Sequence, residues 1–343
     1  MLSPVPTTPR GARRRAARLR SLATNPVVLL GVLTSTILAV LVVIPLVGLV
    51  TTTLTTEGMQ AWRDVLTGRL APNLFWKPLV NSLIVGSGTA LGSTLLGCYV
   101  AWYVVMTDGP FRRTIGVLAT LPFALPSFAL ALAWETVFRN DLVGGRVGIL
   151  QDLGLAVPDW LAWGAVPVTG TLIAHYYSLT FILVAAGLAT VNGDLTEAGE
   201  MAGATRARVA RSIALPIVLP SIVSGAMLAF AEGVSNFAAP AILGLPVRFQ
   251  TLSTRLYGAI STGEVERGYV LSILLIGIAA IILYLSTRVV GRRRSFATIT
   301  GKGGRRSAIQ LGRWRWPLVA IASAIAVCTT ILPGLVLLLA SFA

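Results

Sequence analysis

The chain has 343 residues, of which 55% are hydrophobic and only 12% are charged. This composition excludes an ordinary soluble domain, in which about a quarter of the residues are charged. The formal net charge is +15. Because the basic residues flank long apolar stretches, the charge indicates contact with a membrane surface and not with a nucleic acid.

Seven apolar stretches are long enough to cross a bilayer as helices. A hydrocarbon core of about 30 Å needs roughly 20 helical residues, and a helix satisfies its own backbone polar groups in lipid. We therefore predict an all-α polytopic membrane protein with about seven transmembrane helices. The stretches are 27–50, 79–106, 114–138, 167–190, 219–243, 269–290 and 317–341.

The basic residues predict the orientation of these spans, because Lys and Arg resist translocation. With the N-terminus in the cytoplasm, 20 of the 28 Lys and Arg residues lie inside and eight lie outside. Residues 1–26 form a basic tail without a small-residue cleavage site before the first stretch, so that stretch is predicted to be a retained span. We predict a multi-pass protein of the bacterial inner membrane with a cytoplasmic N-terminus.

Patterns within and between the spans predict packing and shape. Gly88 and Gly92 have the spacing of closely packed membrane helices. The run 121–126 contains two prolines, which free backbone carbonyls, so it is expected to kink a pore-lining helix. The stretch 140–163 is expected to form short interfacial helices outside the membrane.

The sequence supplies no set of catalytic or metal-binding residues. His175 is the only histidine, so neither a Ser-His-Asp triad nor a multi-histidine metal site can form within the chain. A polar contact between helices is its expected role. Cys98 and Cys328 lack metal-ligand spacing, and Gly301-Lys302 lacks the rest of a phosphate loop. We predict no catalytic residue, no metal and no cofactor in this chain.

A polar, arginine-bearing segment at 194–218 interrupts the apolar spans. Asp194 is placed to cap a short helix at 195–202, and Gly203 permits a bend. Thr205 is placed to cap a second helix, which Pro216 is expected to end. The segment is predicted to be a compact cytoplasmic knob of two short helices.

A pattern within the segment opens with Glu197, Ala198 and Gly199, has Gly203 six positions after the glutamate, and closes with Ile213, Leu215 and Pro216. This pattern resembles the EAA loop of importer-type ATP-binding-cassette (ABC) permeases. It has Gly199 where alanine is usual and Val209 where phenylalanine is frequent. The resemblance implies a type I ABC importer transmembrane domain whose knob docks on an ATPase. An amphipathic connector at the lipid headgroups is the alternative. The matching positions, which would couple to the ATPase, are Glu197, Ala198, Gly199, Gly203, Ala204, Ile213, Leu215 and Pro216.

The same resemblance implies the partners of the chain. These are a dimer of ABC ATPase subunits that carries the ATP and Mg, an extracytoplasmic solute-binding protein, and a second permease half or a homologous permease chain. The remaining contacts would be with membrane lipid. A secondary transporter and an integral-membrane enzyme are the rival classes, but the sequence shows neither an inverted repeat nor clustered catalytic groups.

One carboxylate lies within the fifth apolar stretch. Glu232 is four residues before Asn236, so both side chains lie on one helix face. Phe237 and Pro240 follow and indicate a break in the span. A charge at mid-bilayer is costly unless it faces protein or water, so these four residues are candidates for the transport pathway. A glutamate that only packs between helices is the alternative.

Further resemblances concern the domains and the substrate. The run 232–244 resembles iron(III)-type permeases, and 291–316 resembles the basic linker of fused permeases. We therefore predict one permease domain at 27–290 and the start of a second, truncated half at 317–343. Ferric iron is the favoured substrate. Thiamine, 2-aminoethylphosphonate, sulfate and polyamines are alternatives, because permeases for them share much of the pattern. Specificity in such systems rests largely on the binding protein.

Overall fold

The computed structural model describes residues 26–191, 193, 198–199, 201–291 and 309–342. The chain forms two units, residues 1–59 and 60–343. Among the described residues, the regular secondary structure is helical, and six helices are long and apolar enough to cross a membrane, or seven if one bent pair counts as a span. The all-α fold and the predicted number of spans are confirmed.

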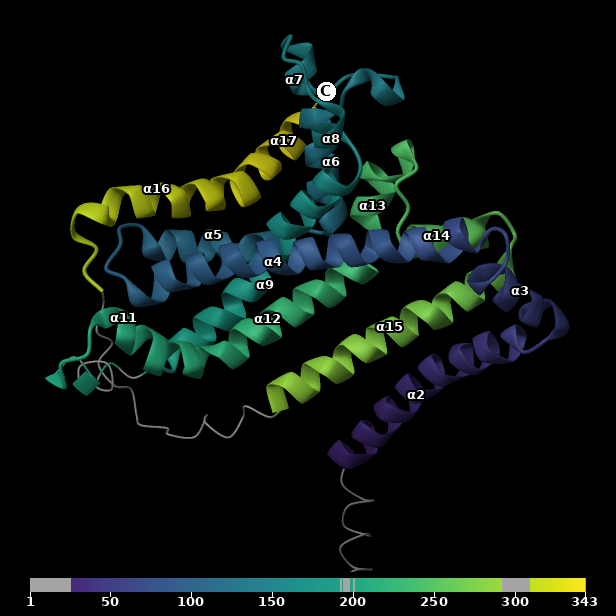
Figure 1. The fold of residues 1–343 in the computed structure, drawn as a ribbon, viewed down its shortest axis with the longest axis horizontal. Helices are drawn as coiled ribbons and strands as arrows, with labels where there is room; N and C mark the ends of the chain where they lie inside the picture. The colour runs from purple at the N-terminus through teal and green to yellow at the C-terminus, as the bar shows by residue number, and fades with distance from the viewer. Residues whose placement is uncertain (1–25, 192, 194–197, 200, 292–308, 343) are drawn as a thin grey trace, which may run out of the picture. The chain divides into compact units, whose positions relative to one another are not determined.

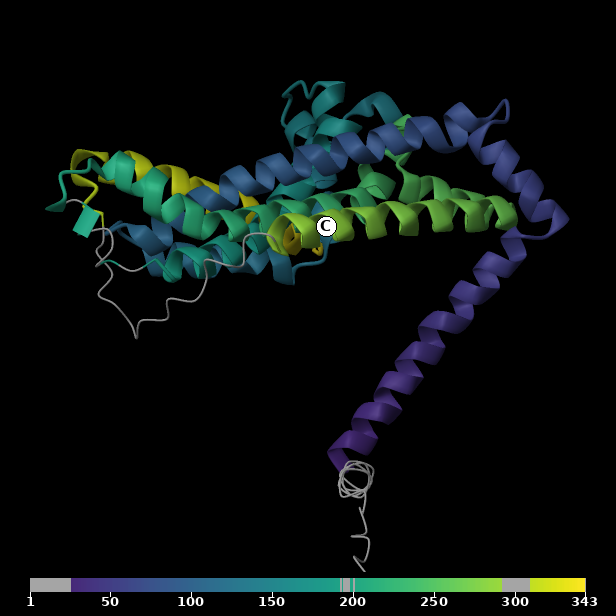
Figure 2. The same cartoon turned by 60° about the horizontal axis from the view of Figure 1, so that its bottom comes forward.

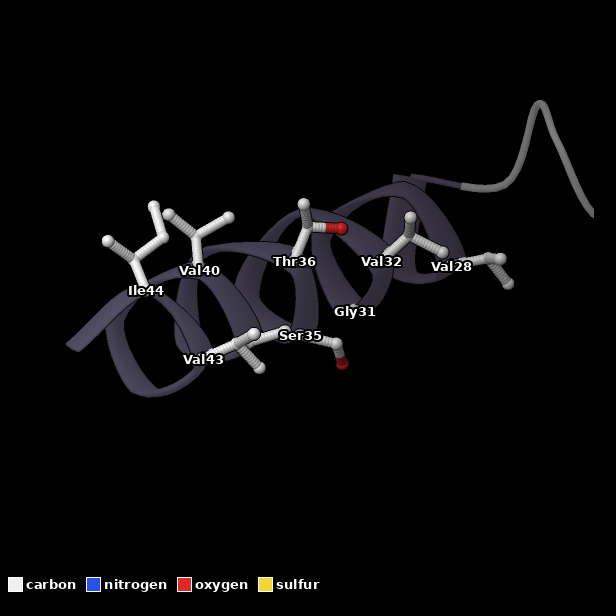
Figure 3. Close-up of a pocket in the computed structure, with 9 residues that line it drawn as sticks. Val28, Gly31, Val32, Ser35, Thr36, Val40, Val43 and Ile44 are labelled. Atoms are coloured by element: carbon white, nitrogen blue, oxygen red, sulfur yellow. The ribbon is translucent and has the colours of Figure 1, made fainter. Parts of the chain in front are cut away.

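The first unit contains α2 (Pro26–Thr53), which has no acidic residue in its first turn and no basic residue in its last. Figure 3 shows a shallow stripe along this helix, lined by small and β-branched residues. Gly31, Ser35 and Ala39 recur along it at intervals of four, a spacing typical of membrane helices that approach other helices closely. The polar groups among its lining side chains are the hydroxyls of Ser35 and Thr36.

The centre of the second unit is formed by three long helices that lie side by side (Figures 1 and 2). They are α4 (Lys77–Met106), α9 (Ala165–Ala189) and α12 (Leu215–Ser235). Gly88 lies against Thr169 and Gly92 lies against Ile173, so the predicted role of these glycines in helix packing is confirmed. Small residues let the helix backbones approach, which strengthens packing where the solvent is as apolar as the core.

We expect a leucine at Gly97 to destabilise this centre. A Cβ atom there would lie 2.9 Å from the Tyr177 carbonyl oxygen and 2.9 Å from the Phe181 nitrogen, and backbone atoms cannot rotate away. Overpacking costs about 1–3 kcal/mol or more. Thermal unfolding in detergent checks this, with Gly277→Leu on α15 (Val265–Gly291) as the control, because nothing lies within 4 Å of Gly277. Equal unfolding temperatures for both variants would contradict the packing argument.

Two of the predicted spans are broken. α5 (Arg112–Ala124) and α6 (Ser127–Phe138) meet at an angle of 98°. Pro126 has no N–H for the carbonyl four residues earlier, and the residue before a proline avoids the helical region, so the kink predicted for 121–126 is confirmed as a sharp break. α12 likewise ends at Ser235, Asn236 is extended, and α13 (Ala238–Leu243) continues the chain.

The stretch 140–163 forms short helices, as predicted. Its fold is fixed by Asn140, whose side-chain nitrogen donates to Asp159 Oδ1 (2.7 Å) and whose Oδ1 accepts from Trp163 Nε1 (2.8 Å). The short helices there are η2 (Asp141–Val143), α7 (Ile149–Asp152) and α8 (Asp159–Ala162); elsewhere lie α3 (Thr56–Leu66), η1 (Pro72–Trp76), η4 (Leu245–Val247) and α14 (Leu252–Ser261).

The C-terminal segment packs on the same bundle. Its α16 contacts α4 and α5, and its α17 contacts α6. The Tyr99 hydroxyl donates to the Leu318 carbonyl (2.7 Å), and Thr329 donates to the Tyr177 hydroxyl (2.9 Å). That this segment begins a second permease half stays a prediction. Its elements are η6 (Gly312–Trp314), α16 (Arg315–Ala326), η7 (Val327–Ile331) and α17 (Leu332–Ala340).

Candidate functional site

The first part of the predicted knob turns at Gly203. This residue has φ +84°, and the Ala204 N–H donates to the Gly199 carbonyl (3.1 Å). A helix often ends with a glycine in the left-handed region, followed by a residue whose N–H donates to the carbonyl five positions earlier, and the chain then changes direction. The predicted bend is therefore confirmed. Asp194 and Glu197 lie outside the described residues.

The second part of the knob starts at Thr205, as predicted. The Thr205 hydroxyl accepts from the Arg208 N–H (3.4 Å), and the Thr205 carbonyl accepts from the Val209 N–H (3.0 Å). Gly199 faces this helix, since a Cβ atom there would lie 3.0 Å from Val209 Cγ2 and 3.4 Å from Ile213 Cδ1. Gly199 and Val209 are the two positions that depart from the EAA pattern. They pack against each other where the two helical parts of the knob meet.

The prediction that Pro216 ends this helix was wrong. α11 (Arg206–Val209), η3 (Ala210–Ala214) and α12 form one continuous helix that ends at Ser235. The Leu215 N–H donates to Ala210, five residues back, and this wider π turn absorbs the missing donor and the ring of the proline. The helix is about 45 Å long, at about 1.5 Å per residue. It connects the knob directly to the break at Asn236.

The same device occurs before two other prolines. The Lys77 N–H donates to Pro72 just before Pro78, and the Leu332 N–H donates to Val327 just before Pro333. In each case the residue before the proline makes the longer π bond. A proline that follows such a turn therefore continues the helix in this protein.

A polar cluster lies at the end of α12. The Tyr176 hydroxyl of α9 donates to Glu232 Oε2 (3.2 Å), and Asn236 Nδ2 lies 3.3 Å from the Tyr176 hydroxyl and 3.1 Å from Ser127 Oγ at the start of α6. Glu232 and Asn236 thus share one face, as their spacing predicts. The cluster joins α6, α9 and α12, and Glu232, Asn236 and Ser127 are only half-buried.

Asn236 bonds through all of its polar groups. Its N–H donates to the Glu232 carbonyl (2.9 Å), its carbonyl accepts from Ser253 Oγ (2.7 Å), and its Oδ1 accepts from the Ala239 N–H (3.1 Å). The asparagine therefore holds the end of α12, the start of α13 and α14 together. A side chain that both caps a helix and bonds sideways fixes the geometry of a break.

The other predicted pathway residues flank the cluster differently. Phe237 is exposed and its ring lies 4.9 Å from that of Tyr257, centroid to centroid. Pro240 is buried within α13. The structure thus brings Glu232 and Asn236 together in one hydrogen-bond network. Phe237 is exposed beside this network, and Pro240 is buried.

Sequence reasoning missed Ser127, Tyr176 and Ser253. A serine that follows a proline and a tyrosine next to the single histidine carry no signal of their own, because only the tertiary fold brings them to Asn236. His175 itself contacts the backbone of Pro122 and stacks on Phe123, with ring centroids 6.2 Å apart. It thus makes the predicted contact between helices, at the break between α5 and α6.

Broken membrane helices joined by a polar cluster, with a helical knob continuous with one of them, are the features of a multi-pass membrane protein. The chain belongs to the family of binding-protein-dependent transport system inner membrane components, whose sequence model matches residues 93–296. It is therefore a permease subunit of an ABC importer and not an enzyme.

Individual relatives agree with this assignment. The chain is 28% identical to the molybdenum transport system permease protein ModB of Escherichia coli K12 over 215 residues, which is 62% of this chain and 91% of that protein. It is 23% identical to the 2-aminoethylphosphonate transport system permease protein PhnV of Salmonella typhimurium LT2 over 273 residues, covering 76% and 94%. A sulfate transport system permease protein, cysT of Chlorokybus atmophyticus, is 27% identical over 179 residues, covering 51% and 60%.

A solved structure shows the same fold. A chain of a bacterial ABC transporter involved in the import of the acidic polysaccharide alginate superposes with a TM-score of 0.61 at 16% identity, covering 80% of this chain and 99% of that chain. At this identity the likeness shows the fold alone. The type I importer transmembrane fold implied by the EAA resemblance is confirmed.

Proposed function

We propose that this permease moves a small oxyanion from an extracytoplasmic binding protein into the cytoplasm. The observation that carries the mechanism is the continuous helix from Arg206 to Ser235, which links the knob to the polar cluster. In this alternating-access scheme, ATP closes two partner ATPase subunits, and their motion passes through the knob and this helix to the spans. The N-terminus lies in the bacterial cytoplasm, as the distribution of basic residues supports.

The knob is the proposed docking element for the ATPase. Its coupling residues are those of the EAA pattern, from Glu197 to Pro216. Among the described ones, Ala198, Leu215 and Pro216 are exposed, while Val209 is buried between the two helices. The buried residues thus set the angle of the knob, and the exposed residues are available to a partner.

The polar cluster is the proposed part of the pathway. Glu232 is the single charged residue of α12, Asn236 directly follows the end of this helix, and both are half-buried. Hydrocarbon would not solvate them, so the open side of the cluster should face water or a second permease half. A second half, on the same chain or on a homologous one, would complete the passage.

The substrate class rests on the relatives. Those described above are named for molybdenum, sulfate and 2-aminoethylphosphonate, which favours a small oxyanion over the ferric iron expected from the sequence. Ferric iron is the second candidate, because residues 232–244 resemble iron(III)-type permeases and because Glu232 supplies a hard oxygen ligand.

Elemental analysis of the partner identifies the cargo. The affinity-tagged permease is purified with its ATPase and binding protein, and the ligand of the binding protein is measured by inductively coupled plasma mass spectrometry and native mass spectrometry. We expect molybdenum, sulfate or a phosphonate, and ATP-dependent uptake of that ligand into proteoliposomes. Iron in the binding protein would reject the oxyanion and support the second candidate. Absence of any ATP-dependent uptake would reject the importer itself.

A further inference from the structure

We propose that Tyr176 is a positioning residue that latches the two broken spans together and thereby holds the pathway closed in this conformation. The proposal rests on the proposed function, since it concerns the same polar cluster. It adds a role for a residue outside the EAA pattern and outside the predicted pathway set.

The first argument is the meeting of the two breaks. Ser127 opens α6 immediately after the 98° break, and Asn236 lies at the break between α12 and α13. Asn236 Nδ2 donates to Ser127 Oγ at 3.1 Å. Two interruptions that are 109 residues apart in the sequence are thus bonded to each other. A passage that opens between α6 and α12 requires this bond to separate.

The second argument is the place of Tyr176. It belongs to α9, which is unbroken, and it is only 5% exposed. Its hydroxyl bonds to both Glu232 and Asn236, and its ring lies edge-on to His175, centroid to centroid 4.6 Å. His175 in turn stacks on Phe123 of α5. Tyr176 thus contacts the broken span that contains α12, and its neighbour His175 contacts the broken span that contains α5.

The third argument is that these bonds can be released. The Tyr176 hydroxyl donates to Glu232 at 3.2 Å, where an O–H···O bond is typically about 2.7–2.8 Å, and accepts from Asn236 Nδ2 at 3.3 Å, where an N–H···O bond is typically about 2.9–3.0 Å. Both bonds are therefore longer than usual. Glu232 lies on the helix that continues into the knob, and Asn236 directly follows the end of that helix. A displacement of that helix therefore acts directly on the bonds, while Tyr176 stays with α9.

The test compares two adjacent tyrosines in the complete transporter. Tyr176→Phe removes only the latch hydroxyl. Tyr177→Phe removes a hydroxyl of the same helix that is also buried but bonds to Thr329, outside the cluster. Complexes with the ATPase and binding protein are reconstituted in proteoliposomes, and ATP hydrolysis and solute uptake are measured with and without loaded binding protein.

We expect Tyr176→Phe to raise ATP hydrolysis without binding protein about three- to tenfold, the factor that the loss of about one ordinary hydrogen bond gives. Uptake per ATP should fall, and Tyr177→Phe should match the wild type in both. A purely structural role would lower hydrolysis and uptake together. Ser127→Ala, which leaves Tyr176 in place, should act in the same direction as Tyr176→Phe and provides the test if that variant does not fold.

A joint fall of hydrolysis and uptake overturns the latch, and so do two further outcomes, which separate the latch from the proposed function. If the wild-type complex imports solute with ATP but the Tyr176 and Tyr177 variants behave alike, the latch is wrong and the proposed function stands. If the wild-type complex shows no ATP-dependent uptake, the proposed function fails and the latch fails with it.

Discussion

Replacing Gly203 by valine is expected to abolish uptake while the chain still inserts in the membrane. Gly203 has φ +84°, a conformation that a β-branched residue rarely adopts. Nothing lies within 4 Å of a Cβ atom built there, so the effect comes from the backbone and not from a clash. The turn between the two helices of the knob would be lost, and with it the surface proposed for the ATPase.

The matched variant at this position is Gly203→Asn. Asparagine tolerates the left-handed region. This variant should therefore keep much of the uptake, although its side chain is about as large as that of valine. Uptake in proteoliposomes and the amount of ATPase that copurifies are measured for both variants. Wild-type uptake by Gly203→Val, in a chain shown to be in the membrane, would remove the coupling role of the turn.

Inserting one alanine between Ala210 and Arg211 is expected to uncouple transport. The span α12 is held by its contacts with α4 and α9. An extra residue before it therefore rotates the preceding helical segment, which carries Val209, relative to α12. One added residue rotates a helix by about 100° and lengthens it by about 1.5 Å. Val209 would then leave the face that meets Gly199, and the exposed face of the knob would point in another direction. Uptake should fall at least about tenfold, which corresponds to about 1.4 kcal/mol.

The control for this insertion is one alanine between Leu155 and Ala156, which are both exposed in the stretch between α7 and α8. That variant should insert, unfold at the wild-type temperature and transport normally. If the insertion at Ala210 also transports normally, the helix from Arg206 to Ser235 does not act as a rigid connection.

Composition and local chemistry were sufficient for the spans and their breaks. Apolar stretches of about 20 residues have few alternatives to helices in lipid. The prolines of 121–126 indicated one break, and Phe237 with Pro240 indicated the other. Gly203 was predictable for the same reason, since a left-handed turn requires a residue without a side chain or with a tolerant one.

The rest depends on interactions that are distant in sequence or on compensation. Tyr176 meets Asn236 across 60 residues, and no local pattern distinguishes it from Tyr177 beside it. Pro216 misled the prediction because a proline removes a donor at one position, while the π turn that compensates for it lies in the residues before. Such compensation is a property of the folded backbone, and the composition of the segment does not encode it visibly.

The π turns before Pro78, Pro216 and Pro333 also affect how this chain is compared with others. A π turn holds one more residue than the α-helical turn it replaces, so in genetic terms it amounts to a single extra codon. Helical-wheel phases read on either side of Ala210–Ala214 therefore differ by one residue. A homologue with an ordinary α-helical turn at this place aligns correctly through this helix only if the alignment places a one-residue gap there, and the faces of the two helical parts then coincide.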